Sequence, residues 1–191
     1  MKHMIVGIVA AVMMAGCSSK SNFYQLHASH YPSTESDTRL KPTIVGIAEV
    51  EVADYLDKPQ IVTRLSAGHV KLHEEERWAG SLDKNIQSLL AYNLSRSLPR
   101  YTFLSQPWEE PVSDAYRIYV NLDRFDGDLN GTVVLSGRWS LVDPEENRLI
   151  LGEKVHYVDR GAPTIDGIVA TQSRLIDRLS ARIAKKIRGR M

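Results

Sequence analysis

The segment YRIYVNLD at residues 116–123 decides the fold of this chain, because its side chains alternate strictly. The even-numbered positions are apolar or aromatic, and the odd-numbered ones are mostly polar. A period of two with β-branched residues is typical of a strand that buries one face. The spacing therefore predicts a strand over residues 115–125.

Two more predicted strands follow this segment. Alternating apolar residues predict one strand around residues 133–141, with Gly137 in its middle, and another over residues 149–158. A polar run that contains Pro144 separates them and is typical of a turn. Residues 115–158 together indicate an antiparallel meander.

The sequence upstream of the meander predicts strands and one helix. Alternation indicates strands over residues 43–52 and 60–65, and residues 69–73 return as a hairpin partner after a turn at Ala67-Gly68. Leucines and isoleucines spaced three and four apart then predict a helix over residues 79–98. Its end is set by Pro99, and residues 101–104 form a short strand.

A second helix ends the predicted domain over residues 164–187, with an apolar stripe at helical spacing. Thr164 is a fitting N-cap for this helix, and Ser81 could cap the first one. The order of strands, helix, strands and helix predicts an α+β fold. We expect a single-domain sandwich of mainly antiparallel sheet with two main helices on one face.

The N-terminus has the features of a secretory signal. Lys2 is followed by a short apolar run and the small residues Ala15-Gly16, directly before the single cysteine, Cys17. The apolar run is about half the roughly 20 residues that a membrane-spanning helix needs. Met14-Ala15-Gly16-Cys17 resembles the bacterial lipobox, which implies cleavage before Cys17 and acyl chains on its thiol. The alternative is an ordinary secretory signal with a chance cysteine.

This signal and the fold pattern together divide the chain into three parts. We expect a lipoprotein signal peptide at residues 1–16, a lipidated tether with a short strand at residues 17–41, and the folded domain at residues 42–191. In the lipoprotein sorting rules, Ser18 and Ser19 with no Asp after the cysteine favour release to the outer membrane. Acyl chains hold a protein firmly only when two or more are attached, since one alone is marginal.

Charge and cysteine content exclude several classes of function. The chain has 24 basic and 23 acidic side chains, and loss of Lys2 with the signal leaves 23 of each. A formally neutral domain argues against a general nucleic-acid surface. A single cysteine allows no disulfide within the chain.

Four short motifs point weakly to chemistry. Residues 126–131 imitate half of a calcium loop, but Gly137 stands where a bidentate Glu is required and the flanks are predicted strands, so a polar hairpin loop is the better reading. Ser81 and Lys84 match a penicillin-binding pattern without its companion motifs, so a helix cap is the better reading. His69 and His73 lie roughly 13 Å apart on a strand, too far to share a metal, so we expect both to be solvent-facing strand residues. The acidic runs at residues 74–76 and 109–110 are interpreted as solvated loops.

The predicted C-terminal helix is rich in cations, and these allow two readings. They could offset the helix dipole, or they could contact anionic head groups or an acidic partner. The cations are Arg174, Arg178, Arg182, Lys185, Lys186, Arg188 and Arg190.

One segment is far more distinctive than these motifs: VADYLDKPQIVTR at residues 52–64. It resembles the signature of the ABC-type transport auxiliary lipoproteins. Three weaker features agree with this resemblance. They are a Phe-Tyr-x-Leu strand at residues 23–26, the pair Arg77-Trp78, and Trp139. The family tends to place such an Arg-Trp pair at the start of its first helix. The resemblance covers essentially the whole mature chain.

The resemblance implies a non-enzymatic lipoprotein that works with an MCE-domain tunnel protein in lipid transport between the two membranes of the envelope. It implies an outer-membrane location and a homo-oligomeric ring, with no cofactor, metal or catalytic residue. The alternatives are a scaffold lipoprotein without lipid handling and, as the least favoured, an envelope hydrolase, for which no nucleophile and base stand out.

Two readings of the distinctive segment stay open. It could be a turn that leads into a core strand, with Pro59 fixing the backbone and Arg64 bonding to a carboxylate or carbonyl. It could instead be a rim that contacts a subunit or partner. The candidate interface residues are Tyr55, Leu56, Asp57, Pro59, Gln60, Arg64, Arg77 and Trp78.

Overall fold

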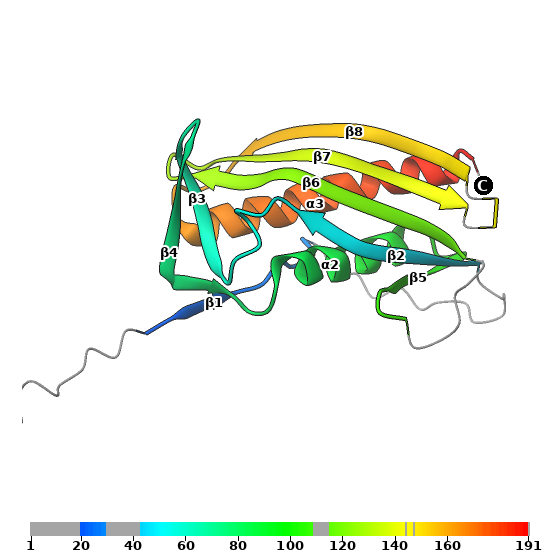
Figure 1. Cartoon of the computed structure of the whole chain (residues 1–191), viewed down its shortest axis with the longest axis horizontal. Coiled ribbons are helices and arrows are strands. Elements are labelled where there is room, and N and C mark those ends of the chain that lie inside the picture. The colour runs from blue at the N-terminus through cyan, green and yellow to red at the C-terminus, as the bar shows by residue number, and fades with distance from the viewer. Residues whose placement is uncertain (1–19, 30–42, 109–114, 144, 147, 191) are drawn as a thin grey trace, which may run out of the picture.

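The computed structural model describes residues 20–29, 43–108, 115–143, 145–146 and 148–190 (Figure 1). Within them the chain folds into eight strands and two helices. In chain order these are β1 (Asn22–Tyr24), β2 (Thr43–Val52), β3 (Gln60–Ser66), β4 (His69–Trp78), α2 (Leu82–Ser97), β5 (Tyr101–Ser105), β6 (Tyr116–Asp128), β7 (Thr132–Asp143), β8 (Arg148–Arg160) and α3 (Ile165–Arg188).

The strands form one sheet in which β6 is the central element. The long strand β6 pairs along one side with both β2 and β3, and along its other side with β7. β5 continues the sheet beyond β2, β4 and β1 continue it beyond β3, and β8 continues it beyond β7. The predicted α+β class and the β6–β7–β8 meander are confirmed.

The sheet is more mixed than the hairpin pattern indicated. The pairings β3–β4, β6–β7 and β7–β8 are antiparallel. The pairings β1–β4, β2–β5, β2–β6 and β3–β6 are parallel. A hairpin joins two strands that follow each other in the sequence, so its turn residues can be recognised there. Parallel pairing joins strands that are distant in the sequence, so no local turn motif indicates it.

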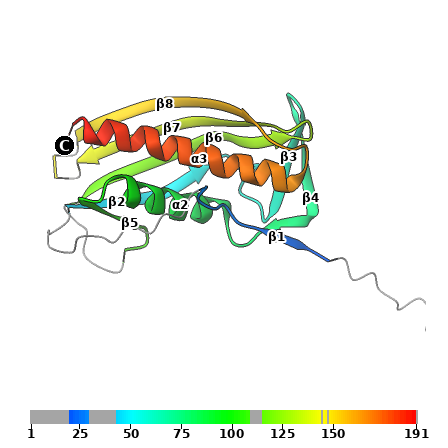
Figure 2. The same ribbon diagram turned by 180° about the vertical axis from the view of Figure 1, so that it is seen from behind.

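Both helices lie on the same side of the sheet, as the view from behind shows (Figure 2). This helix-covered face holds the hydrophobic core. Fully buried side chains of β6 and β7, such as Phe125 and Leu135, pack there against α3 residues such as Ile176 and Leu179. We call the opposite side of the sheet the outer face.

Strand β4 is longer than predicted and changes two expectations. Residues 74–76 form part of β4 and are not a loop; Glu74 accepts a hydrogen bond from Gln60 at 2.9 Å and Glu76 accepts one from Asn22 at 3.1 Å. Arg77 and Trp78 accordingly end β4 and do not start the first helix, which begins at Leu82. Pairing with β1 and β3 holds these acidic residues in the strand.

The described part of the predicted tether, residues 20–29, packs on the domain. Leu26 and Ala28 are buried in the core. The Ser29 backbone N–H donates to Asp177 Oδ2 at 3.2 Å, and the His27 N–H donates to Ser173 Oγ at 3.3 Å, both on α3. This segment therefore belongs to the folded domain.

The two predicted N-caps behave differently. Thr164 accepts a hydrogen bond from the Gly167 N–H at 3.1 Å. Ser81 stands at the N-cap position of α2, but its side chain makes no capping bond.

Thr164→Ala should lower the free energy of unfolding by about 1 kcal/mol, and Ser81→Ala should leave it nearly unchanged. Urea unfolding of the two variants checks this; equal losses would contradict the assignment.

Candidate interaction surface

The eight predicted interface residues lie in the connection from β2 to β3, on β3 and at the end of β4. Arg64 is paired with Val70 near the hairpin turn, so it lies at the other end of β3 from Gln60. The connection from β2 to β3 supplies Tyr55 to Pro59, and the end of β4 supplies Arg77 and Trp78. The two regions are joined because the Trp78 N–H donates to the Pro59 carbonyl at 2.8 Å and Gln60 is paired with Arg77. Cys17 lies outside the described residues.

These residues differ in exposure and therefore in what they can do. Leu56 and Trp78 are buried in the core, so they hold the connection and β4 in place. Asp57 and Pro59 are exposed, and Gln60 is half-buried. The part of this surface that could contact a partner is therefore the exposed turn at Asp57 to Pro59.

Arg64 makes a bidentate ion pair with a carboxylate that is completely buried. Its Nε lies 3.1 Å and its Nη2 2.7 Å from Asp126 Oδ2, and its Nη1 donates to the Ala67 carbonyl at 3.0 Å. Asp126 also accepts from Arg124 Nε at 3.0 Å and from the Tyr55 hydroxyl at 2.6 Å. The Arg64 guanidinium lies over the Tyr55 ring, 5.4 Å from its centre. We call Tyr55, Arg64, Arg124 and Asp126 the ionic cluster.

The electrostatics of this cluster favour an ionised Asp126. Burial by itself would raise the pKa of the Asp126 carboxyl, but hydrogen bonds from Arg64, Tyr55 and Arg124 outweigh it and hold the pKa below its ordinary value. Burial, together with the hydrogen bond to Asp126, raises the pKa of Tyr55 to about 12. Tyr55 is therefore a neutral donor at physiological pH, and Asp126 is a paired anion.

The ionic cluster joins the β2–β3 connection, β3 and β6 at one point. Two of the most distinctive signature residues, Tyr55 and Arg64, are used in this internal bonding. The reading of Arg64 as a bidentate partner of a carboxylate or carbonyl is borne out by both bonds. The cluster fixes the direction of β3 and thereby the position of the exposed turn at Asp57.

Sequence reasoning missed Asp126 and Arg124. It placed Asp126 in a polar loop, but β6 continues to Asp128, and Asp128 Oδ1 closes the following turn by accepting from the Asn130 and Thr132 N–H groups at 2.9 and 3.0 Å. A buried charge in a strand needs a partner, and Arg64 is separated from Asp126 by 62 residues. No local signal marked Asp126, because it stands at an even-numbered position, where the alternation of residues 116–122 predicts an apolar side chain. The register shift between Leu122 and Arg124 changes this phase.

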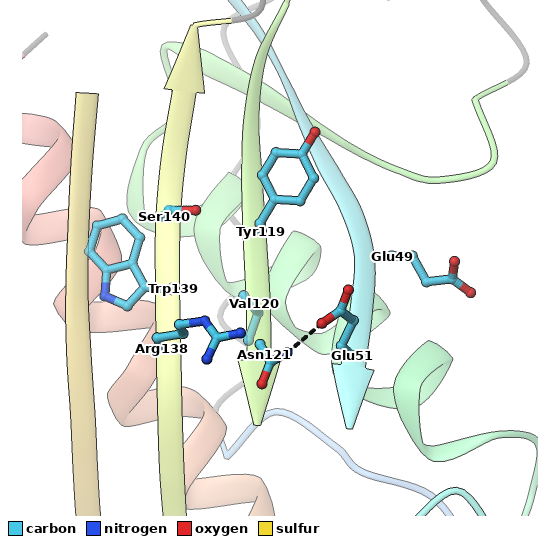
Figure 3. A pocket seen from close by; sticks show the side chains of 8 residues that line it. All are labelled: Glu49, Glu51, Tyr119, Val120, Asn121, Arg138, Trp139 and Ser140. Carbon is cyan, nitrogen blue, oxygen red and sulfur yellow. Dashed lines mark hydrogen bonds between the residues drawn. The ribbon is translucent and has the colours of Figure 1, made fainter. Parts of the chain in front are cut away.

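The outer face carries a second group of polar side chains (Figure 3). Tyr119 and Asn121 on β6, Glu49 and Glu51 on β2, and Arg138 on β7 line a hollow of about 220 Å³. Glu51 accepts a hydrogen bond from the Asn121 amide, drawn as the dashed line in Figure 3. Tyr119 is 41% exposed.

Histidines and metal ligands do not gather in the described part of the chain. No three His, Cys, Asp or Glu side chains are grouped there so that they could hold a metal ion. His69 is exposed, but His73 is half-buried with its Nε2 2.8 Å from Thr63 Oγ1, so only His69 faces solvent as expected. Burial lowers the pKa of His73. Neither α2 nor α3 has the length and apolar character needed to cross a bilayer.

Several cations of α3 contact β8 and α2. Arg174 Nε lies 3.1 Å from Asp159 Oδ2, Arg182 Nε donates to Glu153 at 2.8 Å, Arg178 lies over the Tyr157 ring at 4.4 Å, and Arg188 donates to the Ser97 carbonyl at 2.8 Å. These contacts fasten the helix to its neighbours, a role that the sequence did not reveal. Lys185, Lys186 and Arg190 are exposed, and head-group contact stays a hypothesis for them.

The fold and this surface define the class of protein. It is an α+β domain with one mixed sheet, two helices on one face of the sheet, and an ionic cluster that holds the segment at residues 52–64 in place. The family model of the ABC-type transport auxiliary lipoprotein component matches residues 24–184. The chain belongs to this family, and the resemblance drawn from residues 52–64 is confirmed.

Relatives and solved structures agree with this assignment. The intermembrane transport lipoprotein PqiC of Escherichia coli (strain K12) is 33% identical over 144 residues, 74% of this chain and 74% of that protein. A crystal structure of an uncharacterized protein has a TM-score of 0.73 with 26% identity, covering 88% of this chain and 99% of that one. A Xanthomonas campestris protein, 14% identical, shares the fold with a TM-score of 0.67 over 86% of this chain and 93% of its own.

Proposed function

We propose that this chain is an outer-membrane-anchored periplasmic lipoprotein, a non-enzymatic component of an MCE-type (Pqi-type) intermembrane lipid transport system that maintains the cell envelope. The observation that carries the proposal is family membership together with 33% identity to an intermembrane transport lipoprotein. The lipobox at Met14 to Cys17 supports the anchoring part.

Acyl chains on Cys17, palmitate among them, would hold the domain close to the membrane. Strand β1 begins at Asn22, five residues after Cys17. An extended chain spans at most about 3.6 Å per residue, so this distance is at most roughly 18 Å. Because residues 22–28 pack on the domain, the anchor limits the position of the whole domain and not only of a flexible tail.

The proposed partners are an MCE-domain tunnel protein of the PqiB kind and further copies of this chain in a homo-oligomeric ring. The exposed turn at Asp57 to Pro59 is the proposed partner contact, because Leu56 and the ionic cluster hold it in one place. A fixed exposed turn needs little ordering when it binds, which favours affinity.

Cys17→Ser is expected to abolish lipid attachment, so that the chain accumulates as uncleaved precursor or as soluble protein. The physical reason is that a hydroxyl cannot replace the thiol that carries the acyl chains. Membrane fractionation with mass spectrometry of the N-terminal peptide checks this outcome. Ser18→Ala is the matched control and should fractionate normally; membrane retention of the Cys17→Ser protein would refute the anchoring.

Capture of the full chain from solubilised membranes tests the partnership. We expect an MCE-domain protein to be recovered with wild type and to be reduced at least tenfold with Asp57→Lys, whose thermal unfolding should be unchanged because Asp57 is exposed. Recovery of no MCE protein with wild type would overturn the proposal. Lipid extracted from the captured complex separates transport from the alternative, a scaffold that carries none.

A further inference from the structure

Strand β8 forms one margin of the sheet, and its far edge is open. Among the described strands it pairs with β7 alone, and both views show it at the margin of the sheet (Figures 1 and 2). Residues 151–160 pair without interruption with residues 132–141, so this part of β8 is regular. On such an edge, every second residue directs its N–H and C=O groups away from the neighbouring strand. The edge can therefore pair with one further strand.

A groove of about 480 Å³ runs beside this edge, between β8 and helix α3. Among the described residues that line it, the one carboxylate is that of Glu153, and it is paired with Arg182. Lys154 lies between this groove and the outer-face hollow that Asp123 lines, so its charge is shared between the two. Arg178 also lines the groove. The groove therefore has an excess of positive charge on its α3 side.

Three arginines of α3 face β8, spaced four residues apart. Arg174 and Arg182 are each paired with a carboxylate of β8. Arg178 stands between them and lies over the Tyr157 ring, with 4.4 Å to its centre. Within the described part of the chain Arg178 has no carboxylate partner, and it is exposed. Its N–H donors are therefore free to bind a carboxylate bidentately, and the exposed Lys185 adds a second cation to the groove.

The three arginines contact β8 at positions 153, 157 and 159. These positions share one face of the strand, because side chains on a strand alternate between its faces. A further strand would lie about 4.8 Å beyond β8, with its own side chains on that face directly beside these positions. An acidic side chain beside Tyr157 would then lie next to the Arg178 guanidinium.

We infer that the open edge of β8 binds an extended segment of another protein, which adds to the sheet as a strand and turns acidic side chains towards α3. Backbone hydrogen bonds to β8 give the affinity in this mode of recognition, and side chains at alternate positions give the selectivity. Arg178 and Lys185 are the residues that select for acidic side chains. The inference goes beyond the proposed function and does not depend on it.

Two other occupants fit the groove less well. An anionic head group would pair with the cations but would leave the N–H and C=O groups of the β8 edge without a partner. Antiparallel pairing of β8 with β8 of a second copy would bring two rows of arginines to the same face, where like charges repel each other. An acidic strand from a different protein satisfies both the edge and the cations.

Fluorescence anisotropy with labelled peptides tests the inference, using the mature full chain purified in a non-ionic detergent. The probe is Glu-Val-Glu-Val-Glu-Val-Glu, whose acidic side chains share one face when the peptide is extended. The controls are Glu-Glu-Glu-Glu-Val-Val-Val, which has the same composition, and Lys-Val-Lys-Val-Lys-Val-Lys. The probe should bind at least about tenfold more tightly than either control. Equal affinity for the two acidic peptides would overturn the inference, because it would show attraction of charge without addition of a strand.

Variants of the full chain place the binding in the groove. Arg178→Glu should weaken probe binding at least about tenfold, whereas Arg178→Lys should keep most of it. Lys71→Glu, the same charge change at an exposed position of β4, is the matched control and should bind like wild type. Circular dichroism checks that all three variants are folded. Unchanged binding by the Arg178→Glu protein would overturn the inference.

Hydrogen exchange measured by mass spectrometry reports on the backbone. The bound probe should slow amide exchange within residues 151–160, because the added strand pairs with the open edge of β8. Exchange in β5, which also pairs with a single strand among the described ones, should not change. Binding of the probe without slower exchange in β8 would overturn the inference.

The other two occupants have outcomes of their own. If the soluble head group glycerophosphoglycerol displaces the probe as well as an equal concentration of unlabelled probe does, the groove is a head-group site and the inference is wrong. If Arg178→Glu changes the oligomeric state in native mass spectrometry, the groove is a contact between copies and the inference is also wrong. None of these measurements uses an MCE-domain protein, so their failure leaves the proposed function as it stands.

Discussion

Asp126→Ala is expected to lower the free energy of unfolding by about 3–5 kcal/mol, because it breaks a buried ion pair from one side. Asp126 has no exposed surface, and its carboxylate accepts from Arg64, Arg124 and the Tyr55 hydroxyl. Its removal leaves the Arg64 charge and a phenol without their partner. Urea unfolding measured by circular dichroism checks the value.

Two further variants separate the ionic cluster from nonspecific damage. Asp123→Asn, at an exposed position of the same strand, should change stability by less than about 0.5 kcal/mol. In Arg64→Leu/Asp126→Leu both charges are replaced by apolar groups, and the loss should be smaller than that of Asp126→Ala. A double variant that is less stable than Asp126→Ala would contradict the account given for the buried charge.

The same carboxylate gives a pH dependence with a defined sign. The pKa of Asp126 is lowered in the folded state, so its contribution is complete above the pKa of an unfolded Asp, about 3.9. The contribution is lost as the pH falls through the folded-state pKa. The stability difference between wild type and Asp126→Asn should therefore be constant near neutral pH and shrink below about pH 4. A difference that grows on acidification would contradict the lowered pKa.

Gly137→Ala is the second variant with a large expected effect, about 3 kcal/mol, the upper end of what overpacking usually costs. A Cβ at Gly137 would lie 2.1 Å from the Asn121 carbonyl oxygen and 2.9 Å from Leu122 Cα. Both atoms are backbone of β6, beside the register shift between Leu122 and Arg124. Strands β6 and β7 would have to separate there, at the centre of the sheet.

The matched control for this variant is Gly152→Ala on β8. A Cβ there would meet nothing closer than 3.6 Å, an ordinary contact distance. Gly152 is also exposed, and the added methyl group would make only ordinary contacts with the Leu149 side chain and the Trp139 carbonyl. Thermal unfolding of both variants checks the contrast. Equal losses would show that the glycine at position 137 matters for chain flexibility and not for the close approach of β6.

How much of the candidate site could be predicted depends on how local its bonds are. Residues 52–64 were recognisable because the signature is continuous in sequence, and Pro59 limits its backbone locally. The partner of Arg64 was not recognisable, since Asp126 approaches it only through the parallel pairing of β3 with β6. The polar group on the outer face was hidden for the same reason, because Glu51, Asn121 and Arg138 become neighbours only through strand pairing.

The sequence by itself determined the elements of this protein, its meander, its two amphipathic helices and its family, because these follow from periodicity and from continuous motifs. Only the tertiary structure decided that β6 pairs with β2 and β3 on one side, that Glu74 to Glu76 lie in a strand, and that residues 20–29 pack on the domain. These features depend on contacts between distant segments, where burial of apolar surface and pairing of buried charge outweigh local preference.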